Sequence, residues 1–198
     1  MKKLYWSLLL AGGLTVSSAH AQDIRLGVKA GLSLTSFTGD DAVGTRYKPG
    51  FHGGAILELG LDEDLFIQPE LLVSMKGAQY ENSDLRYNIT YLDVPVMLKY
   101  KLDGLFLEVG PQFGFRTDSE LRTNSGSIKW KNNTRDLDIG YALGLGYETP
   151  KGALVGLRYN GGTTKVGYDR RLGFIGLPAR NIYNSAIQLY VGYMFGRL

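Results

Sequence analysis

The sequence predicts an all-β protein, an eight-stranded antiparallel up-and-down transmembrane β-barrel. Three observations support this prediction. Apolar and polar residues alternate in eight separate segments, the connections between these segments are alternately short and long, and no helical period of 3.6 residues persists. Because successive side chains of a strand point to opposite faces, each segment has one apolar and one polar face. Alternating short and long connections indicate a meander with an even number of strands.

The N-terminal residues have the composition of an export signal. Two lysines precede a short apolar stretch, and the sequence AHA that follows is an A-x-A cleavage site. The apolar stretch is shorter than the ~20 residues that a spanning helix needs, so an uncleaved membrane anchor is the less favoured alternative. We therefore expect a cleaved signal peptide at 1–21 and one outer-membrane β-barrel domain at 22–198, a length that suits a single domain.

The predicted strands have about the ~9–11 residues that a tilted membrane-spanning strand requires. They span residues 23–37, 51–61, 65–76, 91–100, 105–116, 137–148, 153–160 and 186–195. The short connections contain DED, LDG and TPKG, which are compositions of tight turns. All long connections should then lie at one end of the barrel and both termini at the other. Pro69 and Pro111 each remove a backbone donor within a predicted strand, so we expect bulges there.

Alternation alone does not tell a soluble barrel, with its apolar face inside, from a membrane barrel, with its apolar face outside. Three features favour the membrane barrel. Glycine is frequent on the polar faces, and a narrow eight-stranded interior needs small residues beside its charged ones. The charges of these faces balance, as buried charges must. Aromatic residues gather at both ends of the strands, as expected at the two bilayer interfaces.

The charged residues of the polar faces are predicted to form an ion-paired network that closes the lumen. The six cations are Arg25, Lys29, Lys76, Lys99, Arg116 and Arg158, and the six anions are Glu58, Glu70, Asp93, Glu108, Asp138 and Glu148. Balanced partners favour a structural plug over a catalytic acid/base pair. The same balance argues against a narrow conducting pore, which is a weaker alternative.

Several segments carry a family resemblance: GVKAGLSLTSFTGDD, GFHGGAILELGL, FIQPELLVSMKGAQY, YLDVPVMLKYKL and the ending IQLYVGYMFGRL. As a set, they resemble the PorT-type outer-membrane β-barrel family common in Bacteroidota. The resemblance covers essentially all of the chain after the signal peptide. It implies an eight-stranded barrel in the bacterial outer membrane and implies no particular chemistry. The chain departs from the usual outer-membrane terminus, because three residues follow its last aromatic residue, Phe195.

The chain after the signal peptide has one histidine, His52, which excludes a metal site built from several histidines. We expect no metal, no cofactor and no enzyme activity, with His52 in the hydrogen-bond network of the lumen. The alternative is a lipid-modifying enzyme at the outer rim. In that case His52 would serve as a base beside Ser33 or Thr35, with Asp40 or Asp41 as the carboxylate.

The expected partners follow from the charge of the long connections. Of the 22 Lys and Arg residues, Lys2 and Lys3 belong to the signal peptide, so the mature chain, with its 19 Asp and Glu residues, is nearly neutral. This net charge suggests no nucleic-acid partner. The absence of cysteine fits an envelope protein without disulfides.

Positive charge is nevertheless concentrated in the last two long connections. The candidate anion-binding residues are Lys129, Lys131, Arg170 and Arg171. Arginine binds phosphate in a forked geometry that lysine cannot reproduce. We expect outer-membrane lipid and glycolipid as partners, with an envelope protein partner as a further option. Ordinary solvated loop charge is the competing interpretation.

Overall fold

The computed structural model describes residues 24–42, 44–80, 86–123, 126–129, 136–166, 170–172, 175–177 and 181–197. Every regular element within these ranges is a β-strand. A search of the same residues for an apolar helix of membrane-spanning length found no such helix. The predicted signal peptide at 1–21 lies outside the described residues.

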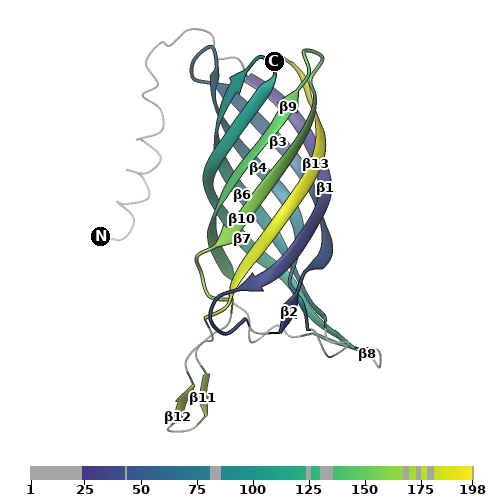
Figure 1. Ribbon diagram of the computed structural model, residues 1–198, viewed down its shortest axis with the longest axis vertical. Helices are drawn as coiled ribbons and strands as arrows, with labels where there is room; N and C mark the ends of the chain where they lie inside the picture. Colours follow the sequence, from purple (N-terminus) through teal and green to yellow (C-terminus); the bar gives the residue numbers. More distant parts are fainter. Residues whose placement is uncertain are drawn as a thin grey trace, which may run out of the picture.

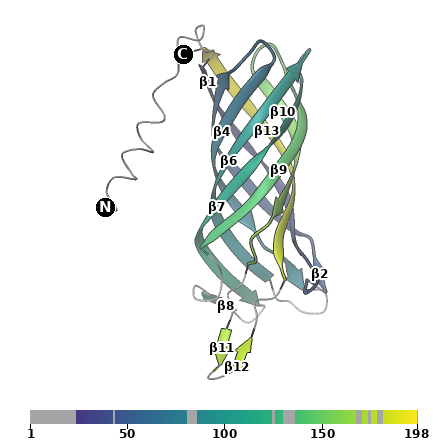
Figure 2. The same cartoon turned by 90° about the vertical axis from the view of Figure 1, so that its left-hand side faces the viewer.

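Eight long strands form a closed barrel (Figures 1 and 2). They are β1 (Ile24–Thr38), β3 (Lys48–Gly60), β4 (Leu65–Lys76), β6 (Arg86–Leu102), β7 (Leu105–Thr123), β9 (Leu137–Glu148), β10 (Ala153–Gly162) and β13 (Tyr183–Arg197). Each pairs antiparallel with the strands before and after it, and β1 pairs with β13 to close the ring. The predicted fold class is therefore confirmed.

Five short strands extend this framework. β2 (Thr45–Arg46), β5 (Gln79–Tyr80) and β8 (Gly126–Lys129) join the barrel sheet, and β11 (Arg170–Leu172) pairs with β12 (Ile175–Leu177) in a separate hairpin. All of them lie at the end of the barrel where the long connections are, opposite the C-terminal end of β13 (Figure 1). The predicted separation of long and short connections is confirmed.

The turn between β6 and β7 shows how the sequence produces the short end. Leu102 pairs with Leu105, so the turn consists of Asp103 and Gly104 alone. Both residues have positive φ angles, 50° and 85°. This is the backbone of a type I′ turn, which Asp-Gly favours and whose twist matches that of the flanking strands.

The strands at the long-connection end are longer than predicted. β6 begins at Arg86 rather than at residue 91, and β7 continues to Thr123 through residues that we expected in a loop. Pairs such as Asn88 with Glu120 join these extensions above the barrel wall. Two strands already in register can continue to pair where their composition no longer alternates clearly.

The predicted bulges at Pro69 and Pro111 are wrong. Pro69 pairs with Val96 of β6, and Pro111 pairs with Tyr141 of β9, without a change of register. The ladder has a gap on the other side of each proline, opposite Leu57 in one case and Val96 in the other. A strand residue donates its N–H to one neighbouring strand only, so a proline interrupts one ladder and needs no extra residue.

The register changes elsewhere, between Arg25 and Gly27 in the pairing of β1 with β13 and between Thr90 and Tyr91 in that of β6 with β7. At the second site, Thr117 is the additional residue on β7. Below this bulge the even-numbered residues of β7 face inward, and above it Ser119 is buried instead. A bulge that adds one residue reverses the two faces of a strand.

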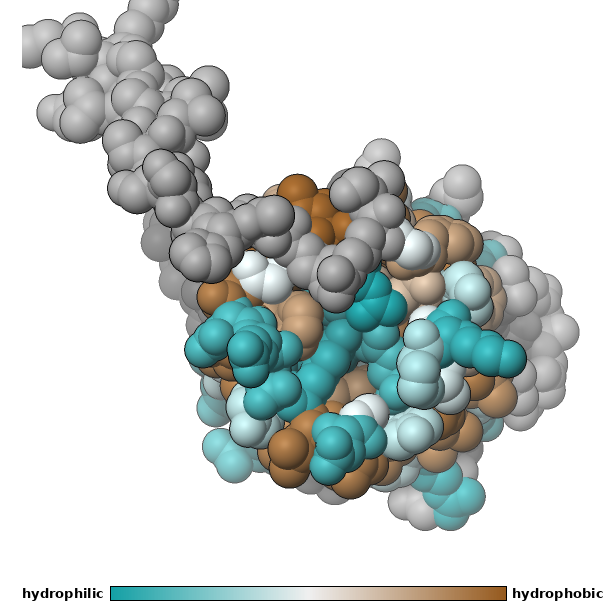
Figure 3. Space-filling view, turned by 90° about the horizontal axis from the view of Figure 1, so that it is seen from above, coloured by the Kyte–Doolittle hydropathy of each residue, from teal (hydrophilic) through white to brown (hydrophobic). Residues whose placement is uncertain are grey.

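The polar faces of the strands lie inside the barrel and the apolar faces outside. Arg158 is only 1% exposed, whereas Leu32 is 71% exposed. Seen from the short-turn end, hydrophilic residues occupy the centre of the mouth and hydrophobic ones surround it (Figure 3). This inversion is typical of a membrane barrel.

Glycines on the inner face leave room for these side chains. A Cβ atom at Gly156 would lie 2.4 Å from the ring of Tyr190, and one at Gly146 would lie 2.3 Å from the ring of Phe106. β9 and β10 therefore carry glycine at the positions that large side chains of other strands approach.

Candidate functional site

The middle of the barrel holds a cluster of two cations and two anions, the middle cluster: Lys29, Glu70, Glu108 and Arg158. Two nitrogens of the Arg158 guanidinium donate to Glu70 at 2.7 and 2.8 Å, and its Nε donates to Glu108 at 2.7 Å. Lys29 Nζ lies 2.7 Å from Glu70 Oε2. All four side chains are buried. Forked pairing of arginine with carboxylate is among the strongest arrangements of charged hydrogen bonds.

These contacts cross the full width of the barrel. In the ring of eight strands, β10 and β4 are four positions apart, which places Arg158 and Glu70 on opposite walls. Lys29 on β1 and Glu108 on β7 likewise face each other across the lumen. Tyr190 completes the layer, because its hydroxyl donates to Glu108 at 2.9 Å while Lys29 lies 4.5 Å above its ring. The middle cluster therefore fills the cross-section.

A second group, the short-turn cluster, consists of Arg25, Glu58, Lys99, Lys101 and Glu148. Lys99 and Lys101 each contact both carboxylates, at 2.7 to 3.2 Å. Arg25 contacts the same two carboxylates at 3.1 and 2.7 Å. Lys101 is not among the predicted lumen residues because the predicted strand ends at Tyr100, although the same alternation continues to one more inward residue.

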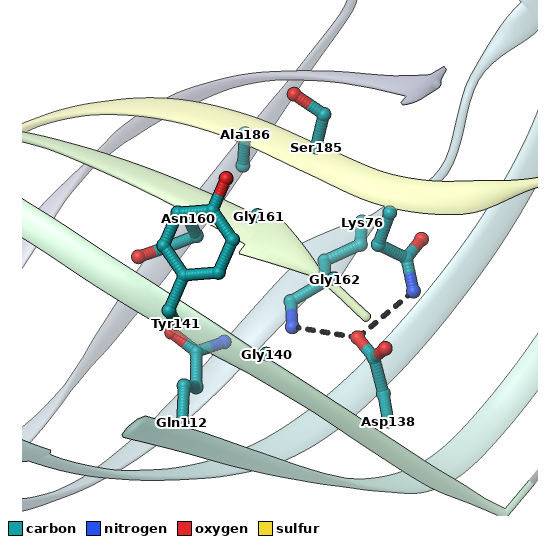
Figure 4. Close-up of a pocket in the computed structure, with 11 residues that line it drawn as sticks. Lys76, Gln112, Asp138, Gly140, Tyr141, Asn160, Gly161, Gly162, Ser185 and Ala186 are labelled. Carbon is teal, nitrogen blue, oxygen red and sulfur yellow. Dashed lines mark hydrogen bonds and ion pairs between the residues drawn. The ribbon is translucent and has the colours of Figure 1, made fainter. Parts of the chain in front are cut away.

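A third group, the long-loop cluster, consists of Lys76, Asp93 and Asp138. Lys76 Nζ lies 3.0 Å from Asp93 and 3.4 Å from Asp138. The Asn184 amide donates to the same Asp138 oxygen at 2.9 Å, so this oxygen receives two donors from different walls (Figure 4). A cavity of about 10 Å³ lies beside the cluster, about the space of one water molecule.

A cluster of buried apolar residues, the cap, lies at the long-loop end of the barrel. Its buried members are Phe37, Ala78, Ile89 and Tyr91, and Ala42, Val166 and Ile182 of the long connections pack against them. Lys48, which we expected in a long connection, is also buried at this end and donates to Asn88 at 2.5 Å. Among the residues that the structure describes, both apolar and polar side chains are thus buried at the end that carries the long connections.

Ten of the twelve charged residues predicted to face the lumen have buried side chains. Arg25 is half-buried in the short-turn cluster. Arg116 is half-buried at the rim, where it pairs with the exposed Asp136 and donates to Ser119 at 3.0 Å. Its position follows from the bulge at Thr117, which turns β7 away from the lumen just above it.

His52 lies inside the barrel wall rather than at its rim. His52 and Ser33 are 1% and 3% exposed, and Ser33 Oγ lies 2.9 Å from His52 Nδ1. Asp40 and Asp41 are exposed, and Asp41 accepts a hydrogen bond from the Asn181 backbone. Of the predicted partners of His52, the structure thus places the Ser33 hydroxyl beside it and leaves both predicted carboxylates exposed, away from the lumen.

The structure describes the four candidate anion-binding residues of the loops only in part. Lys131 lies outside the described residues, and for Lys129, Arg170 and Arg171 the structure describes the backbone of β8 and β11 but not the side chains. Among the residues that the structure describes, no group of three or more His, Cys, Asp or Glu side chains is arranged to hold a metal ion.

A closed eight-stranded barrel with a charged interior and an apolar exterior defines an outer-membrane β-barrel protein. The chain belongs to the family described as the outer membrane protein beta-barrel domain, whose family model matches residues 20–166. It is accordingly a protein of the bacterial outer membrane. No curated protein matches the sequence.

Solved structures with the same fold are distant in sequence. Neisserial surface protein A is 10% identical with a TM-score of 0.55, over 86% of this chain and 97% of that one. The attachment invasion locus protein Ail of Yersinia pestis is 12% identical with a TM-score of 0.51, over 86% of this chain and 98% of that one. The structure of Ail in complex with the heparin analogue sucrose octasulfate is 13% identical with a TM-score of 0.51, over 87% of this chain and 99% of that one. These likenesses show the fold.

Proposed function

We propose that this protein is a small non-enzymatic outer-membrane barrel with a closed, ion-paired lumen, whose outward loops bind envelope lipid, a ligand or a protein partner. The observation that carries this proposal is the middle cluster, in which Arg158 and Glu70 meet from opposite walls. We also propose, from the motifs quoted above, that the chain is a PorT-type barrel within this family. The signal peptide at 1–21 belongs to the same proposal.

The lumen is an unfavourable path for solutes. A permeating ion would have to separate Arg158 from Glu70 and Glu108, and each separated charge would remain buried. Breaking one partner from a buried ion pair costs about 3–5 kcal/mol. The cap adds an apolar barrier at the long-loop end. Both features support a closed barrel whose binding function resides outside the lumen.

The outward loops are the proposed binding surface. In membrane barrels the short turns are periplasmic and the longer loops extracellular, so β8 and the β11–β12 hairpin face outward (Figures 1 and 2). Lys129, Lys131, Arg170 and Arg171 lie in or beside these strands. A barrel of the same fold, Ail, has been solved with a polysulfated ligand. The chemistry of the four residues favours phosphorylated outer-leaflet glycolipid.

The test is to neutralise Lys129, Lys131, Arg170 and Arg171 together as glutamine and to measure the glycolipid that remains bound after extraction. We expect weaker retention and a smaller dependence of retention on salt, because fewer charge contacts are left to screen. Lys151, exposed in the turn between β9 and β10 at the other end, is the control: its replacement by glutamine should leave retention unchanged.

Folding of the variant barrel is checked by its heat-modifiable electrophoretic mobility. Equal glycolipid retention by the folded quadruple variant and the wild type, at low and at high salt, would show that the loop charges are merely solvated.

The alternative function, a lipid-modifying enzyme that uses His52, is less well supported by this geometry. Ser33 and His52 are in contact but buried, and the cap lies between them and the outer surface. Neither side chain is exposed at the outer rim, where an acyl chain would enter. We therefore keep the non-enzymatic barrel as the proposed function.

A further inference from the structure

The connection that follows β1 contacts the base of the last long connection. β1 and β13 pair as far as Thr38 with Tyr183, so Gly39 leaves the barrel beside Asn181. Gly39 has a φ angle of 111°, and a Cβ atom at this position would overlap the Asn181 backbone oxygen. Only glycine combines this backbone conformation with so close an approach. The two connections therefore touch through their backbones.

Asp41 adds a hydrogen bond to the same residue. Its carboxylate accepts the backbone N–H of Asn181 at 2.7 Å. A turn closed by the hydrogen bond from the Ala42 N–H to the Gly39 carbonyl oxygen, at 3.0 Å, brings this carboxylate into place. A hydrogen bond that a carboxylate accepts is stronger than one between neutral groups. We call residues 39–42 the clasp, because they hold Asn181 from two sides.

The base of the last long connection is also closed on itself. The Val166 N–H donates to the Ile182 carbonyl oxygen at 2.9 Å, and Ala42 of the clasp packs with these two side chains against the cap. The β11–β12 hairpin, which carries two of the candidate anion-binding residues, lies between Val166 and Ile182 in the chain. The clasp therefore holds the point from which this hairpin projects (Figure 1).

We propose that the clasp is a positioning element of the outward binding surface: Gly39 and Asp41 fix the base of the last long connection, and thereby the place where Arg170 and Arg171 meet an anionic headgroup. This inference rests on the proposed function. A loop that is held in its bound arrangement beforehand loses less conformational entropy when it binds, so its affinity is higher. Asp41 acts through Asn181 and does not contact the ligand.

The first test measures hydrogen exchange of the Asn181 amide by NMR of the barrel in detergent micelles. Asp41→Ala should speed this exchange several-fold, because the amide loses its acceptor. Asp41→Asn should keep most of the protection, because a side-chain oxygen remains to accept the hydrogen bond. Asp40→Ala removes the neighbouring exposed carboxylate and should leave the exchange rate unchanged.

Two glycines of the same connection provide a matched pair of variants. Gly39 and Gly44 both have positive φ angles, 111° and 75°. In the part of the chain that the structure describes, nothing lies within 4 Å of a Cβ atom at Gly44. Alanine therefore strains the backbone at both positions but meets Asn181 only from position 39. Gly39→Ala should speed the exchange of the Asn181 amide, and Gly44→Ala should not.

The second test measures glycolipid retention by the same variants, with folding checked by heat-modifiable mobility. Asp41→Ala and Gly39→Ala should retain several-fold less glycolipid than the wild type, whereas Asp41→Asn and Gly44→Ala should retain about as much. Asp40→Ala removes a negative charge from the same turn, so its unchanged retention would exclude a simple effect of charge.

The two tests separate the clasp from the proposed function. An unchanged exchange rate of the Asn181 amide in folded Asp41→Ala would overturn the clasp. Faster exchange with unchanged retention would overturn its positioning role, provided that the quadruple loop variant does lose glycolipid. If the quadruple variant loses none, the proposed function fails and the positioning role fails with it, while the exchange rates still decide whether the clasp exists.

Discussion

Replacing Glu70 by glutamine removes one negative charge from the middle cluster and leaves the size of the side chain unchanged. Glu70 accepts two hydrogen bonds from Arg158 and one from Gln68 at 2.6 Å, and it pairs with Lys29 at 2.7 Å. In the variant, Glu108 is the one carboxylate left in the cluster against two buried cations. A buried ion that loses its partner costs about 3–5 kcal/mol. This is a large part of the ~5–15 kcal/mol by which proteins of this size are usually stable.

The assay is urea unfolding of the barrel folded in lipid vesicles, followed by the electrophoretic mobilities of the folded and unfolded forms. Two further variants make the result specific to charge. Glu63→Gln, in an exposed turn, should change the free energy of unfolding by less than about 0.5 kcal/mol. Lys29→Met combined with Glu70→Gln restores neutrality around Arg158 and Glu108, so the double variant should be more stable than Glu70→Gln alone.

A decrease of less than about 1 kcal/mol in the free energy of unfolding of Glu70→Gln, the size of an ordinary surface or hydrogen-bond effect, would refute the role of charge pairing. It is also refuted if the double variant is no more stable than the single one. Either result would mean that the interior tolerates an unbalanced charge, and then charge balance could not explain the composition of the polar faces.

Three further outcomes are expected. In planar bilayers the wild-type barrel should show no steady single-channel conductance, because the middle cluster crosses the lumen; large, stable current steps would contradict a plug. His52→Ala should leave the mass spectrum of the outer-leaflet lipids unchanged; a difference between strains with equal amounts of protein would favour the enzyme alternative. The intact mass of the membrane-extracted protein should correspond to a chain that begins at Gln22, and a chain that retains Met1 would rule out cleavage after Ala21.

The strands and their faces were predictable because both depend on local sequence. The bounds of β4 and β9 agree with the predicted segments 65–76 and 137–148. Alternation places every second residue on one face, and this holds whatever the neighbouring strands are. Glycine on the polar face then indicated which face is enclosed. The same alternation would also have found Lys101, had the strand been followed beyond Tyr100.

The ion pairs were not predictable, because their geometry depends on the whole barrel. Arg158 and Glu70 are 88 residues apart and lie on opposite walls. Whether two such residues meet depends on the tilt and stagger of the strands, which set the height of each residue along the barrel axis. The sequence gives no direct measure of that height. The wrong prediction of bulges at Pro69 and Pro111 has a related cause. The sequence shows that each proline lacks a backbone N–H, but it does not show which neighbouring strand that N–H would have faced.

The distribution of glycine and charge inside the barrel is the outcome of a single constraint. In an eight-stranded barrel, side chains of ordinary size nearly fill the interior. A Cβ atom at Gly144 would lie 2.7 Å from Glu108 Oε1, and at Gly156 it would meet the ring of Tyr190. The glycines of β9 and β10 thus leave room for Glu108 and Tyr190 beside the Arg158 guanidinium. The guanidinium in turn reaches across the lumen to Glu70. Pairing across the lumen and small residues in the wall are thus two parts of one arrangement, because the ion pairs of Arg158 with Glu70 and Glu108 fit only where the opposite wall leaves space for them.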